Sequence, residues 1–199
     1  MYAWRKMTDG QRSEAMKLRE LRSMPFHSPP HSREPGWRRF HLSAANLDHA
    51  FIIGQTVERI TAFTASLCEV LSAGDGELFA WCVLPNHWHA LVGSNDLKAL
   101  LKFIAQLHGR SSFQWNGEEG HRGRQCWHCC SDRRIRTDQH FYAVRNYIHH
   151  NPVKHGHVDN WGEWPFSSAA RFLEEVGREK AAELWESYPP LDMGESWDE

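Results

Sequence analysis

The order of apolar patterns along this chain predicts an α+β fold, an antiparallel sheet with helices packed on it. Apolar side chains recur every three or four residues over 57–71, which is typical of a helix with one buried face. Residues 79–92 form two apolar runs joined by Pro85 and Asn86, which indicates a hairpin of two strands. The full order is strand, helix, strand, strand, helix, strand, helix. This order suits an antiparallel sheet covered by helices.

The first half of the predicted core is bounded by recognisable caps and turns. A first strand is expected over 37–44. Thr56 is the expected N-cap of the first helix, because its hydroxyl can accept a hydrogen bond from a backbone N–H of the first turn. Asn95 or Asp96 is expected to cap the second helix, which should stop or bend near Gly109.

The second half of the predicted core adds a strand and a helix. A glycine-rich loop leads into a short strand expected over 125–130. Thr137 or Asp138 is expected to start the third helix. That helix should end before Pro152, because proline has no backbone N–H to donate. Two short helices form a C-terminal helical extension, over 169–176 and 178–187.

Length and cysteine content favour an intracellular protein with one core domain. A chain of 199 residues suits one domain with extensions. No apolar run follows Met1 and none reaches membrane-spanning length, so we expect neither a signal peptide nor a membrane segment. Five cysteines are an odd number, which argues against a secreted disulfide framework and fits a reducing cytoplasm.

Charge is unevenly distributed along the chain. Residues 1–40 hold 9 Lys/Arg against 4 Asp/Glu, and residues 101–160 hold 9 against 5, giving +5 and +4. Residues 41–100 hold 2 against 6 and residues 161–199 hold 3 against 10, giving −4 and −7. The two basic blocks could bind a polyanion, whereas the acidic tail would repel it. Alternatively, each block is only a solvated surface.

The second strand of the hairpin opens with His87 and His89. Strand side chains alternate between faces, so these two imidazoles point the same way and could bind one cation. The alternative is chance, because the chain has 14 histidines. On the third helix, Tyr147 and Asn151 are four residues apart and project together beside the apolar stripe, whereas Tyr142 lies on the opposite margin.

Four motifs then follow one another at compatible spacing. They are residues 84–92 (LPNHWHALV), Trp127 with Asp132 and Arg136, residues 147–154 (YIHHNPVK), and residues 164–168 (WPFSS). This set resembles the single-tyrosine HUH transposases, and within them the REP-associated tyrosine transposases of bacteria. The resemblance runs from about Trp37 to Ser168. It implies a ferredoxin-like antiparallel sheet for the transposase domain, residues 37–160.

The resemblance also implies a set of functional residues. His87 and His89 would bind a divalent metal ion, Mg²⁺ or Mn²⁺, and Asn151 would supply the third ligand. Tyr147 would be the nucleophile that cuts single-stranded DNA beside palindromic hairpins. The implied product is a 5′-phosphotyrosine intermediate with a free 3′ hydroxyl. Because this link conserves the energy of the phosphodiester, no nucleotide cofactor would be needed.

Seven basic residues near these motifs are expected to hold DNA phosphates. They are Arg122, Arg124, Arg133, Arg134, Arg136, Arg145 and Lys154. Residues 1–36 are expected to form a flexible basic arm, and residues 161–199 short helices with an acidic tail. The expected partner is hairpin or single-stranded DNA in the bacterial cytoplasm. The sequence leaves open whether the protein is a monomer or a homodimer.

Two alternatives remain from the sequence. A domesticated descendant could bind DNA hairpins without cutting them, although it would have no need of a complete His, His, Tyr and Asn set. Cys126 and Cys129 could form half of a zinc site, but the sequence supplies no second pair. For Trp88, Trp115 and Trp127, burial in the core is favoured over stacking on DNA bases.

Overall fold

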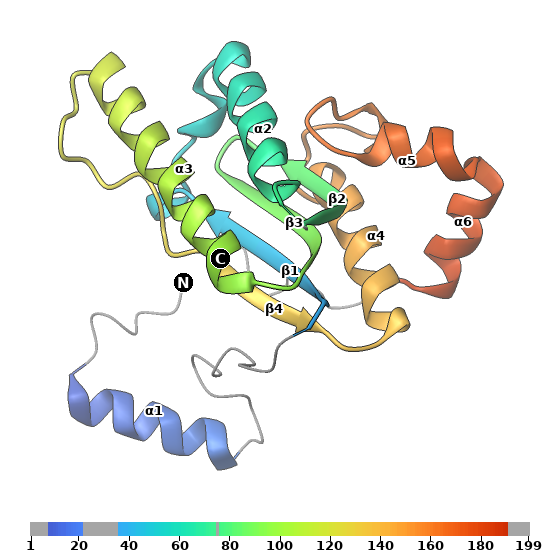
Figure 1. The fold of residues 1–199 in the computed structure, drawn as a ribbon, viewed down its shortest axis with the longest axis horizontal. Helices are drawn as coiled ribbons and strands as arrows, with labels where there is room; N and C mark the ends of the chain where they lie inside the picture. The colour runs from blue at the N-terminus through green and yellow to red at the C-terminus, as the bar shows by residue number, and fades with distance from the viewer. Residues whose placement is uncertain (1–7, 22–35, 75, 191–199) are drawn as a thin grey trace. The chain divides into compact units, whose positions relative to one another are not determined.

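Four antiparallel strands form the central sheet in the order β2-β3-β1-β4 (Figure 1). The strands are β1 (Arg38–Ala45), β2 (Glu77–Val83), β3 (His87–Ser94) and β4 (Ser131–Ile135). The structure, a computed structural model, describes residues 8–21, 36–74 and 76–190. The predicted α+β fold is confirmed, since the sheet is antiparallel throughout and helices pack on it.

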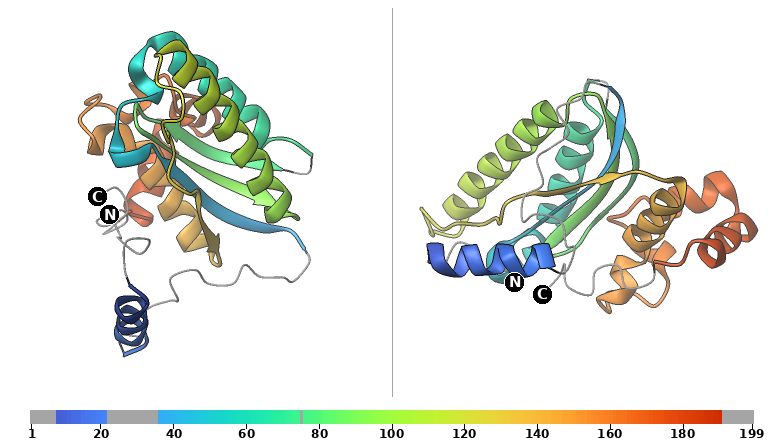
Figure 2. Two further views of the ribbon diagram at one scale, coloured as in Figure 1. Left: turned by 90° about the vertical axis from the view of Figure 1, so that its left-hand side faces the viewer. Right: turned by 90° about the horizontal axis from the view of Figure 1, so that it is seen from below.

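One face of the sheet carries the hydrophobic core. Side chains alternate along a strand, so Leu42 of β1 shares this face with its partner Ala90 and with Trp88 of β3, and all three are fully buried. Two helices cover the face, α2 (Val57–Leu71) and α3 (Leu97–Glu118). Figure 2 shows both on one side of the sheet, with the later helices on the other. The main hydrophobic cluster therefore lies on this side, and the second face is covered by the later helices.

Three side chains cap the core helices as the sequence predicts. The Thr56 hydroxyl accepts a hydrogen bond from the Arg59 backbone N–H at the start of α2. Asp96, rather than Asn95, caps α3 by accepting the Ala99 N–H at 2.9 Å. Thr137 caps the next helix by accepting the His140 N–H at 3.1 Å. Each cap satisfies a backbone donor that has no partner within its helix.

Helix α3 is longer than predicted, because it continues through Gly109 to Glu118. A glycine inside a helix costs only about 1 kcal/mol relative to alanine. The additional turns recover more than that through tertiary contacts. Trp115 is buried in the core, and Glu118 forms an ion pair with Arg59 of α2.

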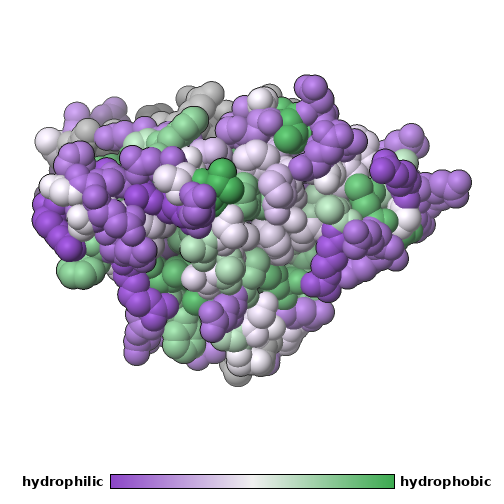
Figure 3. Space-filling model, turned by 90° about the horizontal axis from the view of Figure 1, so that it is seen from above, coloured by the Kyte–Doolittle hydropathy of each residue, from purple (hydrophilic) through white to green (hydrophobic). Residues whose placement is uncertain are grey.

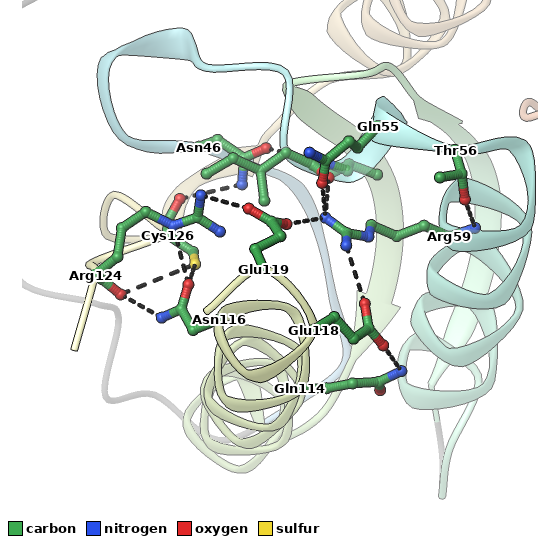
Figure 4. A network of polar contacts seen from close by, with 12 residues as sticks. Asn46, Gln55, Thr56, Arg59, Gln114, Asn116, Glu118, Glu119, Arg124 and Cys126 are labelled. Carbon is green, nitrogen blue, oxygen red and sulfur yellow. Dashed lines mark hydrogen bonds and ion pairs between the residues drawn. The ribbon is translucent and has the colours of Figure 1, made fainter. Parts of the chain in front are cut away.

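A polar network fixes the loop that follows α3 (Figure 4). Arg59 also pairs with Glu119, which in turn pairs with Arg124 at 2.7 Å. Asn116 donates a hydrogen bond to the Arg124 carbonyl and accepts one from the Cys126 thiol. The network joins α2, the end of α3 and the loop, so it holds the chain on its way to β4.

The predicted strand over 125–130 is wrong, and the pairing strand is β4, a few residues later. In the predicted segment Trp127 makes an isolated bridge to Asn46. Its indole is buried and stacks on His108 with ring centroids 4.0 Å apart. The aromatic and cysteine-rich run is therefore a core-filling segment. The polar residues after it form the ladder at the sheet edge, where only one neighbour is needed.

The fourth helix, α4 (Asp138–Lys154), covers the second face of the sheet and also exceeds its predicted end. Pro152 lies inside its last turn, where a missing N–H costs one hydrogen bond near the end of the helix. The chain turns out of the helix at Gly156, whose φ of +68° is the left-handed conformation typical of a helix C-terminus.

The segment after α4 protects the outer edge of β2. The Val83 N–H donates to the Phe166 carbonyl at 2.8 Å, and the Ser168 N–H donates to the Trp81 carbonyl at 2.9 Å. Backbone groups at this edge are thereby paired rather than open to another strand. Two short helices follow, as predicted, α5 (Ala169–Val176) and α6 (Arg178–Ser187).

The helix α1 (Asp9–Leu21) belongs to a compact unit separate from the one that holds the sheet. The rest of the predicted basic arm, residues 1–7 and 22–35, lies outside the described residues, as does the chain end from 191. Within the described ranges, no helix combines the length and apolar character needed to cross a membrane.

Large apolar side chains reach the surface at separate positions. Phe113 is 71% exposed and Phe51 is 63% exposed. On the face shown in Figure 3, several separate apolar side chains lie among hydrophilic ones. Isolated apolar residues of this kind are normal on a protein surface and do not by themselves mark a binding site.

Candidate active site

The second face of the sheet brings the predicted site residues together. In the β1–β3 ladder, His87 lies opposite Ala45 and His89 lies opposite Ser43, so both imidazoles point to the face that α4 covers. From α4, Tyr147 and Asn151 project toward the same two histidines. The hairpin and one helix therefore supply all four residues.

The four side chains are in direct contact. His87 Nε2 lies 3.0 Å from Asn151 Oδ1, and the ring centroids of His87 and His89 are 5.1 Å apart. The Tyr147 ring packs edge-on against His89, with centroids 5.2 Å apart. Tyr142 instead stacks on Tyr188 with centroids 4.8 Å apart.

These residues are more buried than their place at the start of a strand suggests. His87 is 4% exposed, His89 and Tyr147 are 2% exposed, and Asn151 is fully buried. The two histidines are therefore buried, although they do not belong to the main hydrophobic cluster. Helix α4 packs on this face of the sheet with both apolar and polar side chains buried. The site is therefore part of a packed layer.

Asn86 sets the orientation of His87. The Asn86 side-chain Nδ2 donates to the His49 carbonyl at 3.1 Å, which directs Oδ1 toward His87. His87 Nδ1 is 2.7 Å from that oxygen and, in the neutral ring, carries the proton and donates it. The other nitrogen, Nε2, then presents a lone pair toward Asn151.

This donor set fits a divalent metal ion. A neutral His87 Nε2 and an Asn151 Oδ1 at 3.0 Å present two lone pairs to one another, which is unfavourable unless a cation or a proton lies between them. Two donors at right angles around an ion with bonds of about 2.1 Å are separated by about 3.0 Å. In addition, Asn151 Nδ2 is buried and has no hydrogen-bond partner among the described residues. An amide held by a metal through its oxygen would account for that arrangement.

The proposed ligand set consists of two imidazoles and one amide oxygen and contains no carboxylate or thiolate. Among the described residues, no group of three or more His, Cys, Asp or Glu side chains could hold a metal ion. A neutral ligand set of this kind leaves coordination positions for a substrate phosphate and water, which are ligands that Mg²⁺ commonly takes. Cys126 is engaged by Asn116 as described above.

Positive charge lies close to the Tyr147 phenol. Burial lowers the pKa of Arg133, and the electrostatic interaction of Arg133 with Tyr147 partly opposes this decrease. Arg133 lies on β4 opposite His41, on the same face of the sheet. Lys154 Nζ lies 5.4 Å from the centre of the Tyr147 ring. Both cations favour negative charge on the phenol oxygen.

The remaining predicted DNA-contact residues differ in their solvent exposure and in their contacts within the protein. Arg134 and Arg136 are exposed along and just after β4. Arg122 is also exposed, but its guanidinium stacks on Phe113 and donates to the Phe113 carbonyl at 2.8 Å. These three guanidinium groups all lie at the surface.

Two other predicted arginines are held by the protein itself. Arg124 belongs to the network that fixes the loop after α3. Arg145 is 9% exposed, and its guanidinium lies over the rings of Tyr142 and Phe172. Since α5 and α4 enclose it, Arg145 holds the C-terminal helices to α4.

The tryptophans of the core are buried, as the sequence favours. Trp88 is fully buried and donates its indole N–H to His108 Nε2 at 3.2 Å. Trp115 and Trp127 are 4% and 7% exposed. These indoles are packing residues, and base stacking is not available to them in this structure.

Sequence reasoning missed two residues that contact the predicted ligands. Asn86 directly precedes His87, so its position next to the motif was a usable signal. His41 lies on β1, and its Nε2 is 3.2 Å from His89 Nδ1. Only the register of β1 against β3 reveals this second contact.

Comparison with known proteins gives consistent results. Residues 49–151 match the family model for IS200-like transposases. A protein assigned as a REP-associated tyrosine transposase in Haemophilus influenzae is 35% identical over 132 residues, which cover 59% of this chain and 70% of that protein. The REP-associated tyrosine transposase of Escherichia coli is 30% identical over 109 residues, 48% of this chain and 55% of that one.

A solved structure shares the fold. It is a REP-associated tyrosine transposase bound to a REP hairpin, which matches with a TM-score of 0.55 at 22% identity. The match covers 76% of this chain and 87% of that chain. From the family model and the identity to the Haemophilus protein, the chain belongs to the IS200-like transposase family.

Proposed function

We propose that this protein is a metal-dependent endonuclease and strand transferase that cuts single-stranded DNA next to palindromic hairpins. The observation that carries the proposal is the arrangement around His87, where Asn151 Oδ1 lies 3.0 Å away and Tyr147 packs on the neighbouring His89. A nucleophile and a set of metal ligands on one packed face suit phosphoryl transfer. Membership of the transposase family supports DNA as the substrate.

Tyr147 is the proposed nucleophile. Its hydroxyl oxygen attacks the phosphorus of one phosphodiester, the P–O3′ bond breaks, and the phenol proton is lost to solvent. The 3′ oxygen leaves and takes up a proton, so the products are a 5′-phosphotyrosine and a 3′ hydroxyl. One phosphodiester replaces another, and the reverse attack by a 3′ hydroxyl can therefore rejoin strands without a nucleotide cofactor.

The protein's own residues prepare that step. Arg133 and Lys154 favour negative charge on the phenol oxygen, which offsets the weak nucleophilicity of a neutral tyrosine. His87, His89 and Asn151 would hold a divalent ion, Mg²⁺ or Mn²⁺. When bound, that ion polarises the phosphoryl oxygens and stabilises the charge that develops on them.

Exposed basic residues are the proposed contacts to the DNA backbone. Arg134 lies within β4, Arg136 directly follows it and Lys154 ends α4, so both elements that border the site carry positive charge. The solved relative with the same fold is bound to a REP hairpin, which supports a hairpin as the binding partner here. A DNA substrate places the proposed activity in the bacterial cytoplasm, where the chromosome is.

The proposed domain organisation follows from the site. Residues 37–160 contain every proposed catalytic and metal-binding residue and form the transposase domain. The arm at 1–36 and the C-terminal region at 161–199 are proposed as accessory segments that adjust DNA binding.

A single incubation tests the proposal. Purified full-length protein is mixed with 5′- and 3′-labelled hairpin oligonucleotides carrying single-stranded flanks, with Mg²⁺, Mn²⁺ or EDTA. We expect a protein–DNA adduct on a denaturing gel that retains the label on the 3′ side of the cut and requires the metal. Hairpin binding with no adduct under any metal would instead favour a binding protein without cleavage activity.

A further inference from the structure

His41 contacts the site from a strand that contributes no predicted ligand. It lies on β1, two residues from Ser43, which pairs with His89 across the ladder. This diagonal placement puts His41 Nε2 3.2 Å from His89 Nδ1, with the two ring planes 33° apart. The His41 ring centroid also lies 6.1 Å from that of Tyr147. His41 itself is 3% exposed.

The contact constrains the protons on both rings. Two neutral imidazole nitrogens at this distance can bond only if one carries hydrogen and the other a lone pair. An imidazole that binds a metal through Nε2 must carry its hydrogen on Nδ1. His89 Nδ1 would then donate to His41 Nε2, and the hydrogen of His41 would lie on its own Nδ1.

We propose that His41 is a positioning residue that holds His89 in the tautomer and ring orientation needed to bind the metal. This inference rests on the proposed function, because it assigns a role relative to the proposed metal ligands. Asn86 occupies the equivalent place for His87, since it accepts from that ring's Nδ1 at 2.7 Å. Each histidine thus has its Nδ1 engaged by a neighbouring strand or turn residue, and ligating histidines are commonly held through their second nitrogen.

Packing alone does not explain an imidazole at this position. Burying a polar ring costs free energy unless its nitrogens are bonded, so an aliphatic residue would fill a purely structural site more favourably. His108 shows what a buried histidine with a packing role looks like here. It lies in the apolar core, stacks on Trp127 and accepts a hydrogen bond from Trp88. His41 instead bonds to a proposed metal ligand.

Metal affinity in the absence of DNA tests the role directly. The dissociation constant for Mn²⁺ is measured by electron paramagnetic resonance on full-length wild type, His41→Leu, His41→Gln and His108→Gln. Leucine cannot accept a hydrogen bond, so we expect His41→Leu to weaken Mn²⁺ binding about 10–100-fold. Glutamine can accept one through Oε1, so His41→Gln should retain most of the affinity. His108→Gln is the matched control and should bind Mn²⁺ as wild type does.

The outcomes separate this role from the proposed function. Wild-type affinity in His41→Leu, or equal losses in the leucine and glutamine variants, would overturn the positioning role while leaving metal binding intact. A wild-type protein that does not bind Mn²⁺ would overturn both. Long-range ¹⁵N–¹H spectra of histidine-labelled wild type give a readout that needs no variant. We expect His89 to carry hydrogen on Nδ1, and hydrogen on Nε2 would refute the proposal.

Discussion

Tyr147 on α4 packs edge-on against His89 on β3, with their ring centroids 5.2 Å apart and the planes at 74°. The helix and the strand are far apart in sequence, and the contact exists because α4 packs on the face of the sheet that carries both histidines. Asn151, one helical turn later, reaches His87 from the same helix. The proposed nucleophile and a proposed metal ligand therefore lie on one rigid helix, an arrangement that would favour the proposed phosphoryl transfer.

Replacing Tyr147 with phenylalanine should abolish the covalent DNA adduct. The variant retains the ring that packs on His89 and loses only the hydroxyl, so hairpin binding and thermal stability should stay close to wild type. Adduct formation is read on a denaturing gel with Mn²⁺. Tyr142→Phe is the matched control on the same helix, and since Tyr142 stacks on Tyr188 away from the histidines, it should form the adduct normally. An adduct that persists in Tyr147→Phe would assign the nucleophile elsewhere.

Replacing His87 or His89 with alanine should lower metal-dependent cleavage to below about 1% of wild type, because each removes a proposed ligand. Both side chains are buried, so each variant should also lose roughly 1–3 kcal/mol of unfolding free energy. Cleavage must therefore be measured well below the melting temperature of each variant. His155→Ala is the control, since that exposed ring lies 4.9 Å from His87 and is not a proposed ligand. Undiminished cleavage in His87→Ala would exclude His87 from the metal site.

The sequence was most informative where local chemistry decides the structure. Thr56 caps its helix as predicted, and Asp96 and Thr137 are each one of the two neighbouring candidates that the sequence offered. Each side chain places an oxygen close to the first backbone N–H groups of its helix. The hairpin turn at Pro85 and Asn86 is similarly local. These features need no knowledge of the rest of the fold.

Features that depend on tertiary contacts were predicted less well. The strand near Trp127 was misplaced because aromatic residues are common both in strands and in hydrophobic cores. Here Trp127 is buried in the core without being part of a strand. The extension of α3 past Gly109 depends on Arg59 of another helix. His41 escaped notice because its relation to His89 follows from strand register, which a single sequence does not contain.

Unfolding stability should fall as pH is lowered from 6.5 to 4, in part through His108. Burial in the apolar core lowers the pKa of His108 from 6.5 to about 4, so the native state holds it neutral while the unfolded chain takes up a proton. Its contribution is present in full above pH 6.5 and is lost as pH falls through the native pKa. The full linkage is at most roughly 3 kcal/mol.

The contribution of His108 can be isolated with His108→Gln, which retains an acceptor for the Trp88 indole N–H but does not titrate. Urea unfolding is measured at several pH values for both proteins. The difference in unfolding free energy between wild type and variant should narrow as pH falls from 6.5 to 4. A constant difference would mean that His108 is not neutral in the native core. His149, whose pKa burial lowers to about 3, contributes in the same direction in both proteins.

Replacing Arg136 with glutamine should weaken hairpin binding uniformly across DNA sequences and reduce its salt dependence. A phosphate contact to single-stranded DNA contributes about 0.7 to the slope of log affinity against log salt. We therefore expect the slope to fall by about that amount in a titration between low and moderate salt. Arg171→Gln is the control, because that exposed arginine lies on α5 and pairs with Glu175. An unchanged slope in Arg136→Gln would remove Arg136 from the DNA interface.

Removing the last nine residues should tighten DNA binding. They carry four carboxylates, Asp192, Glu195, Asp198 and Glu199, and no lysine or arginine. Like charges repel a phosphate backbone over a Debye length of about 8–10 Å near physiological salt. A chain ending at Pro190 should therefore bind single-stranded DNA more tightly than the full chain at low salt and equally at high salt.

The residue at which the chain is truncated decides whether only charge or also stability is changed. The Asn146 side chain on α4 donates to the Tyr188 carbonyl at 2.9 Å, and Tyr142 stacks on the Tyr188 ring. A chain ending at Glu186 loses both contacts beside Tyr147, so it should lose about 1–2 kcal/mol of unfolding free energy in addition to its charge. Fluorescence anisotropy and thermal unfolding of both truncations separate the two effects. Weaker DNA binding by the stable chain ending at Pro190 would instead make the last nine residues part of the DNA site.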